Sequence, residues 1–442
     1  MRGVTRFAAV TFSAVLLVLL AACGGGEKEV PFPTLAPFPP ELQQRIHEIR
    51  DRVSAIRGLP PYELVIEGII SPEALQQHSR DQIAATSEED LADLEAYDAV
   101  LTILGLIGPE VDLKQLFADD FSGLIAGLYL IDEDRLVLVG SGDLALSIQD
   151  EITLAHEYVH SFQDGAYGID KTREQWQEGD LEEDGYSQYS ATIDCLIEGD
   201  ASLADELYAE QVFGSDWRAK VDAESAASGA SGPMDMPEFL LRDFVFNYRE
   251  CPDFVRQLYD EGGWDAVNAA YQHPPSTTEQ VLHLDKFKSR ELASTLPPED
   301  LTKQLDDWNL MDSSQFGEFD VYNYAVTLAK DNGAASAAAA GWGSGWSSVY
   351  RDKNDSGRVV VQLSFGWDTR DDLVEFLTVY EAILGGLAAS IEIVDDKGNA
   401  RWTAPGQFGV ITIDLDLLRA DIRIASHEDA LKLATSDLTA FN

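Results

Sequence analysis

The apolar residues of the N-terminal half recur mostly at helical spacing. Over residues 41–57, leucine, isoleucine and valine return every three or four positions with charged residues between them, which places the apolar side chains on one face of a helix. Ser71 before a proline and Ser87 before three acidic residues are typical helix starts. The pattern also predicts long helices over 189–213 and 239–271, the second broken at a proline and at a glycine pair.

A different pattern interrupts these helices. Apolar runs at 128–131 and 136–139 flank an Asp-Glu-Asp-Arg turn, which predicts a β-hairpin. Ser147 then precedes another amphipathic stretch and can cap a helix. Residues 215–237 include a segment rich in serine and glycine, which predicts a mobile loop.

Strand-like runs return beyond residue 300. They occupy 347–351 and 359–365 and recur within 391–414, around an amphipathic helical segment. Strands and helices in this arrangement predict a small α+β unit. We therefore expect an α+β protein with two domains, a mostly helical one with a small sheet over 41–295 and a C-terminal α+β domain over 296–442.

The N-terminus has the features of an exported protein. Two arginines precede the apolar stretch 7–22, which is short for a membrane-spanning helix. It ends in Leu-Ala-Ala-Cys, which resembles the bacterial lipobox, where the cysteine, here Cys23, carries the lipid. We expect residues 1–22 to be a signal peptide and the Gly/Pro-rich residues 23–40 to be a tether; an uncleaved anchor is the alternative. The expected location is the extracytoplasmic face of the bacterial cell envelope.

The net charge narrows the range of partners. The chain has 78 acidic and 31 basic residues, a formal net charge of -47. Such a surface repels phosphate groups, so nucleic acid and anionic lipid are not expected partners, and attachment to the membrane would rest on the acyl chains of Cys23. In an oxidising compartment, Cys195 and Cys251 either form a disulfide or remain two separately buried thiols.

The strongest chemical signal is the sequence His156-Glu157-Tyr-Val-His160. On a helix, positions i and i+4 share a face, so both imidazoles can reach one metal ion. Zinc lowers the pKa of a bound water to about 7. Glu157, one step around the helix, would act as general base while that water attacks a carbonyl. Two satisfied surface histidines are the alternative.

A catalytic zinc site needs a third protein ligand. Ala166 stands where the longer histidine motif has its last ligand, so we expect a carboxylate from a following helix. Glu198 is the chosen ligand, because it lies beside an apolar stretch where a solvated glutamate is less expected. The competing carboxylates are Glu178, Glu182, Glu183, Glu206 and Glu210.

Together these segments resemble gluzincin metallopeptidases. The stretch 155–164 and the downstream sequence Glu198-Gly-Asp-Ala carry the resemblance. More narrowly, the chain is similar to a group of poorly characterised bacterial lipoproteins that share a Gly-x-Tyr strand before the zinc helix, a segment like 274–283 and a Trp-Gly run like 341–343. The resemblance implies a zincin-like fold, zinc as cofactor and hydrolysis of peptide bonds.

The resemblance also implies further site residues. In gluzincins an aspartate four residues after the ligand glutamate often orients a zinc-bound histidine. Ser202 stands there instead, which leaves Asp194 or Asp200 for this role. A histidine or tyrosine donates a hydrogen bond to the transition-state oxyanion. We expect His283 in that role, with Tyr248 as a weaker alternative and packing of its own loop as the other use of His283.

The expected function is that of a membrane-anchored zinc peptidase acting on peptides or proteins. The strand 128–131 would present its edge to an extended substrate, which would add as a β-strand. The alternative is a surface lipoprotein that keeps the fold but acts as a binding or assembly factor. The intact Glu157 argues against it, because such a protein has no need for that base. A metal-dependent hydrolase of an ester or glycosidic bond is a third hypothesis.

Overall fold

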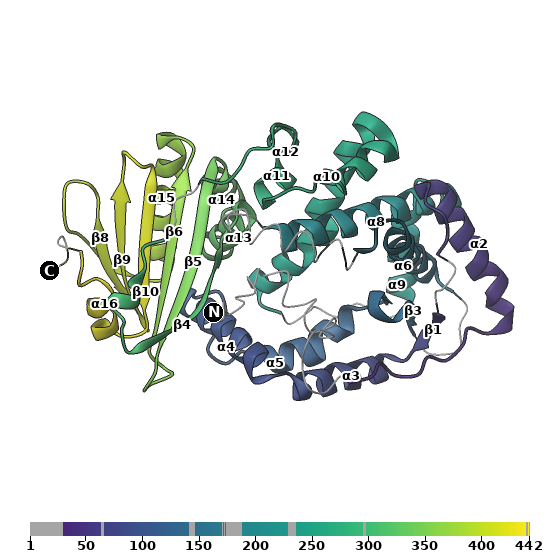
Figure 1. Cartoon of the computed structure of the whole chain (residues 1–442), viewed down its shortest axis with the longest axis horizontal. Coiled ribbons are helices and arrows are strands. Elements are labelled where there is room, and N and C mark those ends of the chain that lie inside the picture. Colours follow the sequence, from purple (N-terminus) through teal and green to yellow (C-terminus); the bar gives the residue numbers. More distant parts are fainter. Residues whose placement is uncertain are drawn as a thin grey trace, which may run out of the picture.

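The protein is α+β, as predicted, and its small and large sheets lie at opposite ends of the molecule (Figure 1). This computed structural model describes residues 30–62, 66–140, 146–169, 171, 173, 188–228, 236–294, 298–438 and 441. The signal peptide predicted for 1–22 and the lipid predicted on Cys23 fall outside the described residues.

The helices are, in chain order, α2 (Pro40–Arg57), α3 (Pro72–Ala85), α4 (Glu88–Leu104), α5 (Leu113–Gln115), α6 (Ile148–Tyr167), α8 (Tyr189–Phe213), α9 (Trp217–Ser228), α10 (Glu238–Ala270), α11 (Thr278–Leu282), α12 (Leu284–Ser289), α13 (Glu318–Ala329), α14 (Asn332–Ala339), α15 (Arg370–Gly386) and α16 (Glu428–Ala434). Shorter π- and 3-10-helical turns are η1 (Leu116–Phe121), η2 (Ser122–Leu124), η3 (Ile131–Glu133) and η4 (Leu301–Lys303). The strands are β1 (Ile66–Ile70), β2 (Gly127–Leu130), β3 (Arg135–Val139), β4 (Trp308–Gln315), β5 (Trp342–Asp352), β6 (Val359–Trp367), β7 (Ser390–Ile393), β8 (Ala400–Ala404), β9 (Gln407–Asp414) and β10 (Arg419–Ala425).

The small sheet lies beside the helix that carries the histidine motif. Its strand order is β1-β3-β2. The predicted hairpin is confirmed, since β2 pairs antiparallel with β3. The parallel pairing of β1 with β3 was not predicted, because the five residues Ile-Glu-Gly-Ile-Ile are too few for their periodicity to distinguish a strand from a helix segment. β2 is therefore an edge strand, and the Tyr129 hydroxyl donates a hydrogen bond to Asp164 of α6 over 3.2 Å.

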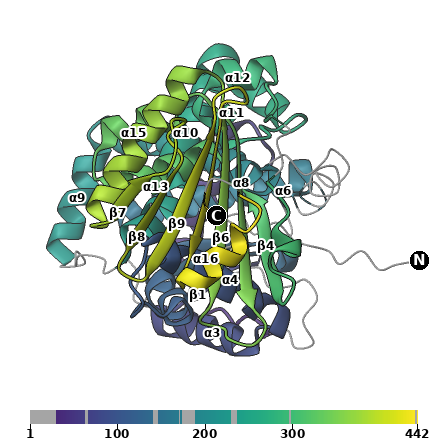
Figure 2. The ribbon, with the colours of Figure 1, turned by 90° about the vertical axis from the view of Figure 1, so that its left-hand side faces the viewer.

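The large sheet is antiparallel and has the order β4-β5-β6-β10-β9-β8-β7. Every residue of β6 is buried, because both faces of this central strand are covered. Val361, Leu363 and Phe365 face α4, α13, α14 and α15, while Val360 faces the α16 side together with Tyr350. Figure 2 shows α16 in front of the strands.

One hydrophobic core crosses the boundary predicted between residues 295 and 296. Leu101 of α4 and Phe239 at the start of α10 belong to the same buried cluster as Phe365 of the large sheet. The helical part and the C-terminal sheet are thus joined by apolar packing, which anchors the first turn of α10.

Two local predictions are wrong. The predicted loop at 215–237 contains the helix α9, because the serine- and glycine-rich sequence begins only where α9 ends and alanine, lysine and glutamate favour a helix before it. The predicted break at Pro252 does not occur: α10 continues through it, held by the buried Cys251 and Phe254 beside it. The break at the glycine pair does occur, with Gly263 at φ 63°.

The described part of the predicted tether packs on the fold. Ala36 and Ile69 exchange two backbone hydrogen bonds of 2.9 and 2.8 Å, and Phe38 is only 5% exposed. Residues 30–39 thus continue the folded unit toward the N-terminus. Within the ranges that the structure describes, no helix is both long and apolar enough to cross a membrane.

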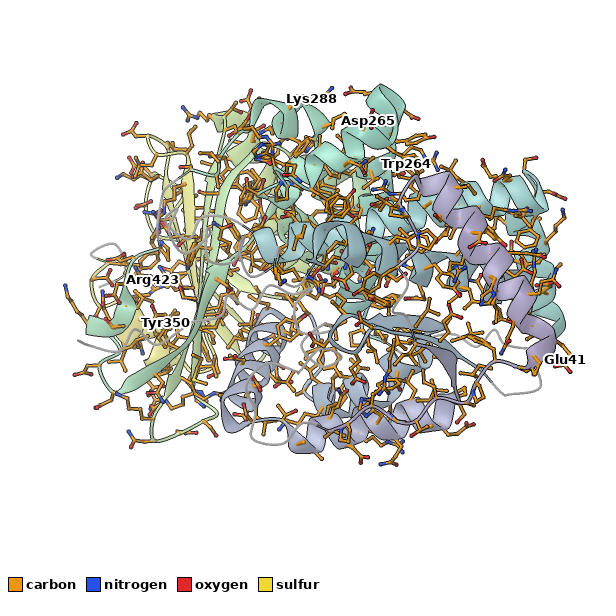
Figure 3. All side chains as sticks on the ribbon, turned by 45° about the vertical axis from the view of Figure 1, so that its right-hand side comes forward. Glu41, Trp264, Asp265, Lys288, Tyr350 and Arg423 are labelled. Atoms are coloured by element: carbon orange, nitrogen blue, oxygen red, sulfur yellow. A yellow bond between two sulfur atoms is a disulfide. The ribbon has the colours of Figure 1, made fainter. Side chains whose placement is uncertain are left out.

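A buried ion pair joins α2 to α8. Arg57 and Asp200 are both 0% exposed, and Nη2 of Arg57 donates to Oδ2 of Asp200 over 2.8 Å. The Tyr271 hydroxyl donates to the same oxygen over 2.9 Å, and the guanidinium lies 4.3 Å from the ring centre of Trp264, which Figure 3 labels on α10. The pair fixes the position of α8, whose other turns carry the candidate site.

We predict that Asp200→Ala lowers the free energy of unfolding by about 3–5 kcal/mol, because it leaves the Arg57 charge buried without a partner. Denaturant unfolding of the metal-free protein, followed by circular dichroism, measures the loss. Asp51→Ala is the matched control: Asp51 pairs with Arg50 at an exposed position, and its loss should cost no more than about 0.5 kcal/mol. Equal effects of the two substitutions would contradict the assignment.

Candidate metal centre

The helix α6 carries the histidine motif, and its N-terminus is capped. The Ser147 side chain accepts from the backbone N–H of Asp150 (3.1 Å), and the Asp150 carboxylate accepts from the backbone N–H of Ser147 (2.8 Å), which forms a capping box. The predicted cap is thus confirmed. Two turns later, His156, Glu157 and His160 lie where α6 faces α8.

Glu198 of α8 lies at the point where the two imidazoles converge. Its Oε2 is 3.2 Å from Nε2 of His156 and 3.6 Å from Nε2 of His160, and the ligand atoms of all three residues lie within 4.8 Å of one another. A tetrahedral zinc site with bonds of about 2.0–2.2 Å has ligand atoms about 3.4 Å apart. These three side chains therefore fit zinc in both donor type and spacing.

Both histidines have their other ring nitrogen occupied. Nδ1 of His156 donates to Oδ2 of Asp205 over 2.8 Å, and Nδ1 of His160 donates to Oε1 of Gln163 over 3.0 Å. The Gln163 amide nitrogen in turn donates to the Ile197 carbonyl over 3.0 Å, so its oxygen must be the atom that faces the histidine. Each ring thus keeps a proton on Nδ1 and turns Nε2 toward Glu198, so that Nε2 is the atom that would bind a metal ion.

Asp205 replaces the two aspartates predicted to orient a histidine. Asp200 pairs with Arg57, and Asp194 pairs with Arg173 over 2.6 Å, so both carboxylates are committed to arginines. Asp205 lies seven residues after Glu198, two turns along the same face of α8. A spacing of seven residues can be read from the sequence, but the gluzincin pattern predicts the orienting aspartate four residues after the glutamate, where Ser202 stands.

The competing third ligands do not reach the histidines in the described structure. Glu206 accepts hydrogen bonds from Arg218 and Arg256, and Glu210 is exposed and lies more than three turns beyond Glu198 along α8. Glu178, Glu182 and Glu183 lie outside the described residues.

Glu157 is held between the metal ligands and the edge strand β2. It is 7% exposed, and a Cβ on Gly127 would lie 3.0 Å from its Cγ and 2.5 Å from Cγ2 of Thr153. Only glycine therefore allows β2 to approach α6 this closely. With the hydrogen bond from Tyr129 to Asp164, this explains the Gly-x-Tyr pattern: glycine permits the contact and tyrosine fixes it.

His283 does not lie in this site. Its Nε2 is 2.9 Å from Oε1 of Glu318 on α13, and it is absent from the lining of the cavity at the histidines. The structure therefore does not bring the expected oxyanion donor to the histidines, since His283 is engaged with α13 instead. Tyr248 of α10, the weaker alternative, lines that cavity, with its ring centre 6.2 Å from that of His156.

The buried acids of the site attract positive charge. Burial alone would lower the pKa of His156, but hydrogen bonds with Asp205 and Glu198 raise it well above its usual value. Burial alone would raise the pKa of Glu198, but the two histidines hold it well below its usual value. Burial raises the pKa of Glu157, although the histidines oppose the effect. Glu198 thus stays ionised, as a metal ligand must be.

A disulfide connects α8 to α10 close to Glu198. Cys195 and Cys251 are joined, which settles the alternative left open by the sequence. A Cβ on Gly199 would lie 2.4 Å from the Cys251 carbonyl oxygen, so glycine permits close contact of the two helices beside Glu198. This contact places Tyr248, on the preceding turn of α10, opposite the motif on α6.

A cavity of about 500 Å³ opens onto the cluster. Residues 126–131, which include β2, form one wall, and α10 forms the other. A second group of acids, Glu279, Glu291 and Asp368, is less suited to a metal, because the Lys286 ammonium contacts all three carboxylates.

Comparison of the chain with family models, with curated proteins and with solved structures yields no match.

We predict that Asp205→Asn weakens zinc binding about 10- to 100-fold, because the amide does not hold the His156 ring as the carboxylate does. Competition with a zinc-binding dye measures the affinity. Glu210→Gln, on the same helix but exposed, is the control and should bind zinc as the unmodified protein does. An unchanged affinity in Asp205→Asn would show that this hydrogen bond does not tune the ligand.

Proposed function

We propose that the protein is a zinc-dependent peptidase in which His156, His160 and Glu198 hold the ion and Glu157 is the general base. The observation that carries this proposal is the convergence of two Nε2 atoms and one carboxylate oxygen, with Glu157 beside them and a cavity in front. When bound, zinc supplies Lewis acidity, lowering the pKa of a water molecule to about 7 and polarising a substrate carbonyl.

Glu157 has the position and environment of a proton carrier. It lies between the ligand cluster and the substrate cavity, and its raised pKa makes it a better base than an exposed glutamate. In the proposed reaction its carboxylate accepts a proton from the attacking water. It then passes that proton to the amine that leaves when the peptide bond breaks.

Tyr248 replaces His283 as the proposed oxyanion donor. Its hydroxyl stays protonated at neutral pH, because the negative charge of the nearby Glu198 raises the pKa of Tyr248 well above its usual value. A neutral hydroxyl next to the ligands can donate a hydrogen bond to a carbonyl oxygen that gains negative charge.

The edge strand β2 supports recognition of a peptide backbone. It is bonded to β3 on one side only, and residues 126–131 line the cavity. A substrate in extended conformation can add there as a further strand, which aligns its backbone with Glu157. The proposed partner is thus a peptide or an unfolded segment of a protein.

The lipoprotein location belongs to the same proposal. The apolar segment before Cys23 and its lipobox-like ending support export and lipid attachment, and the Cys195–Cys251 disulfide fits an oxidising compartment. We therefore propose that the enzyme acts at the outer face of a bacterial membrane.

We predict that Glu157→Gln abolishes peptide hydrolysis while zinc remains bound with near-native affinity, because the amide cannot accept the proton and Glu157 is not a ligand. A proteomic cleavage screen and metal analysis of the purified protein measure the two quantities. Glu198→Ala is the companion variant and should lose both zinc and activity. Bound zinc without hydrolysis by the unmodified protein would favour the binding or assembly factor instead.

We predict that Tyr248→Phe lowers kcat about 10²- to 10³-fold with little change in KM, because it removes one hydrogen-bond donor to the oxyanion. Tyr259→Phe, on the same helix and in edge-to-face contact with Trp264, is the matched control. His283→Gln tests the corrected assignment and should leave kcat within about threefold. A larger loss in His283→Gln than in Tyr248→Phe would reverse the assignment.

A further inference from the structure

The cavity extends well past the metal ligands along one face of α10. Leu240, Asp243, Phe244, Asn247 and Tyr248 all line it, and this spacing is that of a single helix face. Tyr97 of α4 closes the same region from the opposite side. The part beyond Tyr248 can therefore hold a side chain of a substrate whose backbone lies at the ligands.

Asp243 is the polar group of this region. It is 8% exposed and lines the cavity, yet no hydrogen bond or ion pair reaches its carboxylate from any residue within the described ranges. Its ionisable neighbours include the Tyr97 hydroxyl and Asp320, whose charge has the same sign. An isolated buried carboxylate is costly unless a donor or cation reaches it, so a ligand that supplies one would be favoured here.

The charges around the cavity are mostly negative. Asp132, Glu133 and Asp205 line it in addition to Asp243 and the ligand set. Arg173 also lines it, but its guanidinium is 2.6 Å from Asp194. With the net charge of -47, this surface draws cationic peptides toward the cavity and repels acidic ones.

The distance from Tyr248 suits a neighbouring substrate residue. Asp243 precedes Tyr248 by five positions, which is about 7.5 Å along the helix axis. Two residues of an extended peptide span about 6.6 Å. A side chain one or two residues from the bond that is cut can therefore reach Asp243.

We propose, on the basis of the proposed peptidase function, that Asp243 forms a specificity pocket for a lysine or arginine side chain next to the scissile bond. The apolar Leu240 and Phe244 contact the methylene stem, and the Asp243 carboxylate accepts hydrogen bonds from the cationic end group. Burial raises the pKa of Asp243 well above its usual value, with a contribution from Asp320, and a bound cation offsets that effect.

The test uses the zinc-loaded protein and peptides that carry lysine, norleucine or glutamate at one position beside the cleaved bond. Norleucine keeps the apolar stem of lysine but lacks its charge. We expect kcat/KM for lysine to exceed that for norleucine by roughly 10- to 100-fold, with glutamate the poorest. In Asp243→Asn the ratio of lysine to norleucine should fall to near one.

Asp265→Asn is the matched control. Asp265 is exposed on the C-terminal part of the same helix (Figure 3), away from the cavity lining, so the change removes one negative charge and should leave the ratio unaltered. An equal fall in both variants, or no preference for lysine in the unmodified protein, would overturn the pocket.

Binding separates this inference from the proposed reaction. The same peptides, labelled with a fluorophore, are titrated into zinc-loaded Glu157→Gln with and without Asp243→Asn. If the unmodified protein cleaves no peptide but lysine peptides bind more tightly only while Asp243 is present, the peptidase proposal fails and the pocket stands. If cleavage occurs and binding shows no such preference, the pocket fails alone. If no peptide binds or is cleaved, both are overturned.

Discussion

The structure around the site depends on the burial of four carboxylates on one helix. Asp194, Glu198, Asp200 and Asp205 of α8 are all largely withdrawn from water, and each carboxylate must face a cation or a donor. Asp194 pairs with Arg173, and Glu198 lies against the two histidines. Asp200 pairs with Arg57, and Asp205 with His156. A rotation of α8 by one residue would break all these pairings at once. The position of Glu198 is therefore determined by charges well outside the ligand set.

The long helix α10 gives a contrast. It is held on α8 by a disulfide and by the close contact at Gly199, but among the described residues its buried acid Asp243 has no partner of the kind that these four acids of α8 have. Native proteins keep few buried polar groups unsatisfied, and those that remain concentrate at functional sites. The same helix contributes Tyr248, so one rigid element links the reacting centre to the region that would select the substrate.

The sequence was most informative where a short local rule determines geometry. Histidines four residues apart share a helix face, and Glu198 was found because an acid beside apolar neighbours needs a partner. Asp205 and Gln163 were missed although their spacings from Glu198 and His160 are helical. The position of His283 was not predicted, because its distance from the histidine motif on α6 depends on how α11, α12 and α13 pack. The parallel strand β1 and the shared core across residue 295 are likewise long-range results that local patterns do not encode.

The packing of residues 30–39 on the fold limits how far the protein could lie from a bilayer. If Cys23 carries the lipid, only residues 23–29 separate the folded part from the membrane, and at full extension they span at most about 25 Å. A longer connection would let the cavity reach molecules far from the membrane, whereas a connection of this length would keep the cavity close to the membrane surface. Components of the envelope near that surface would then be the accessible substrates.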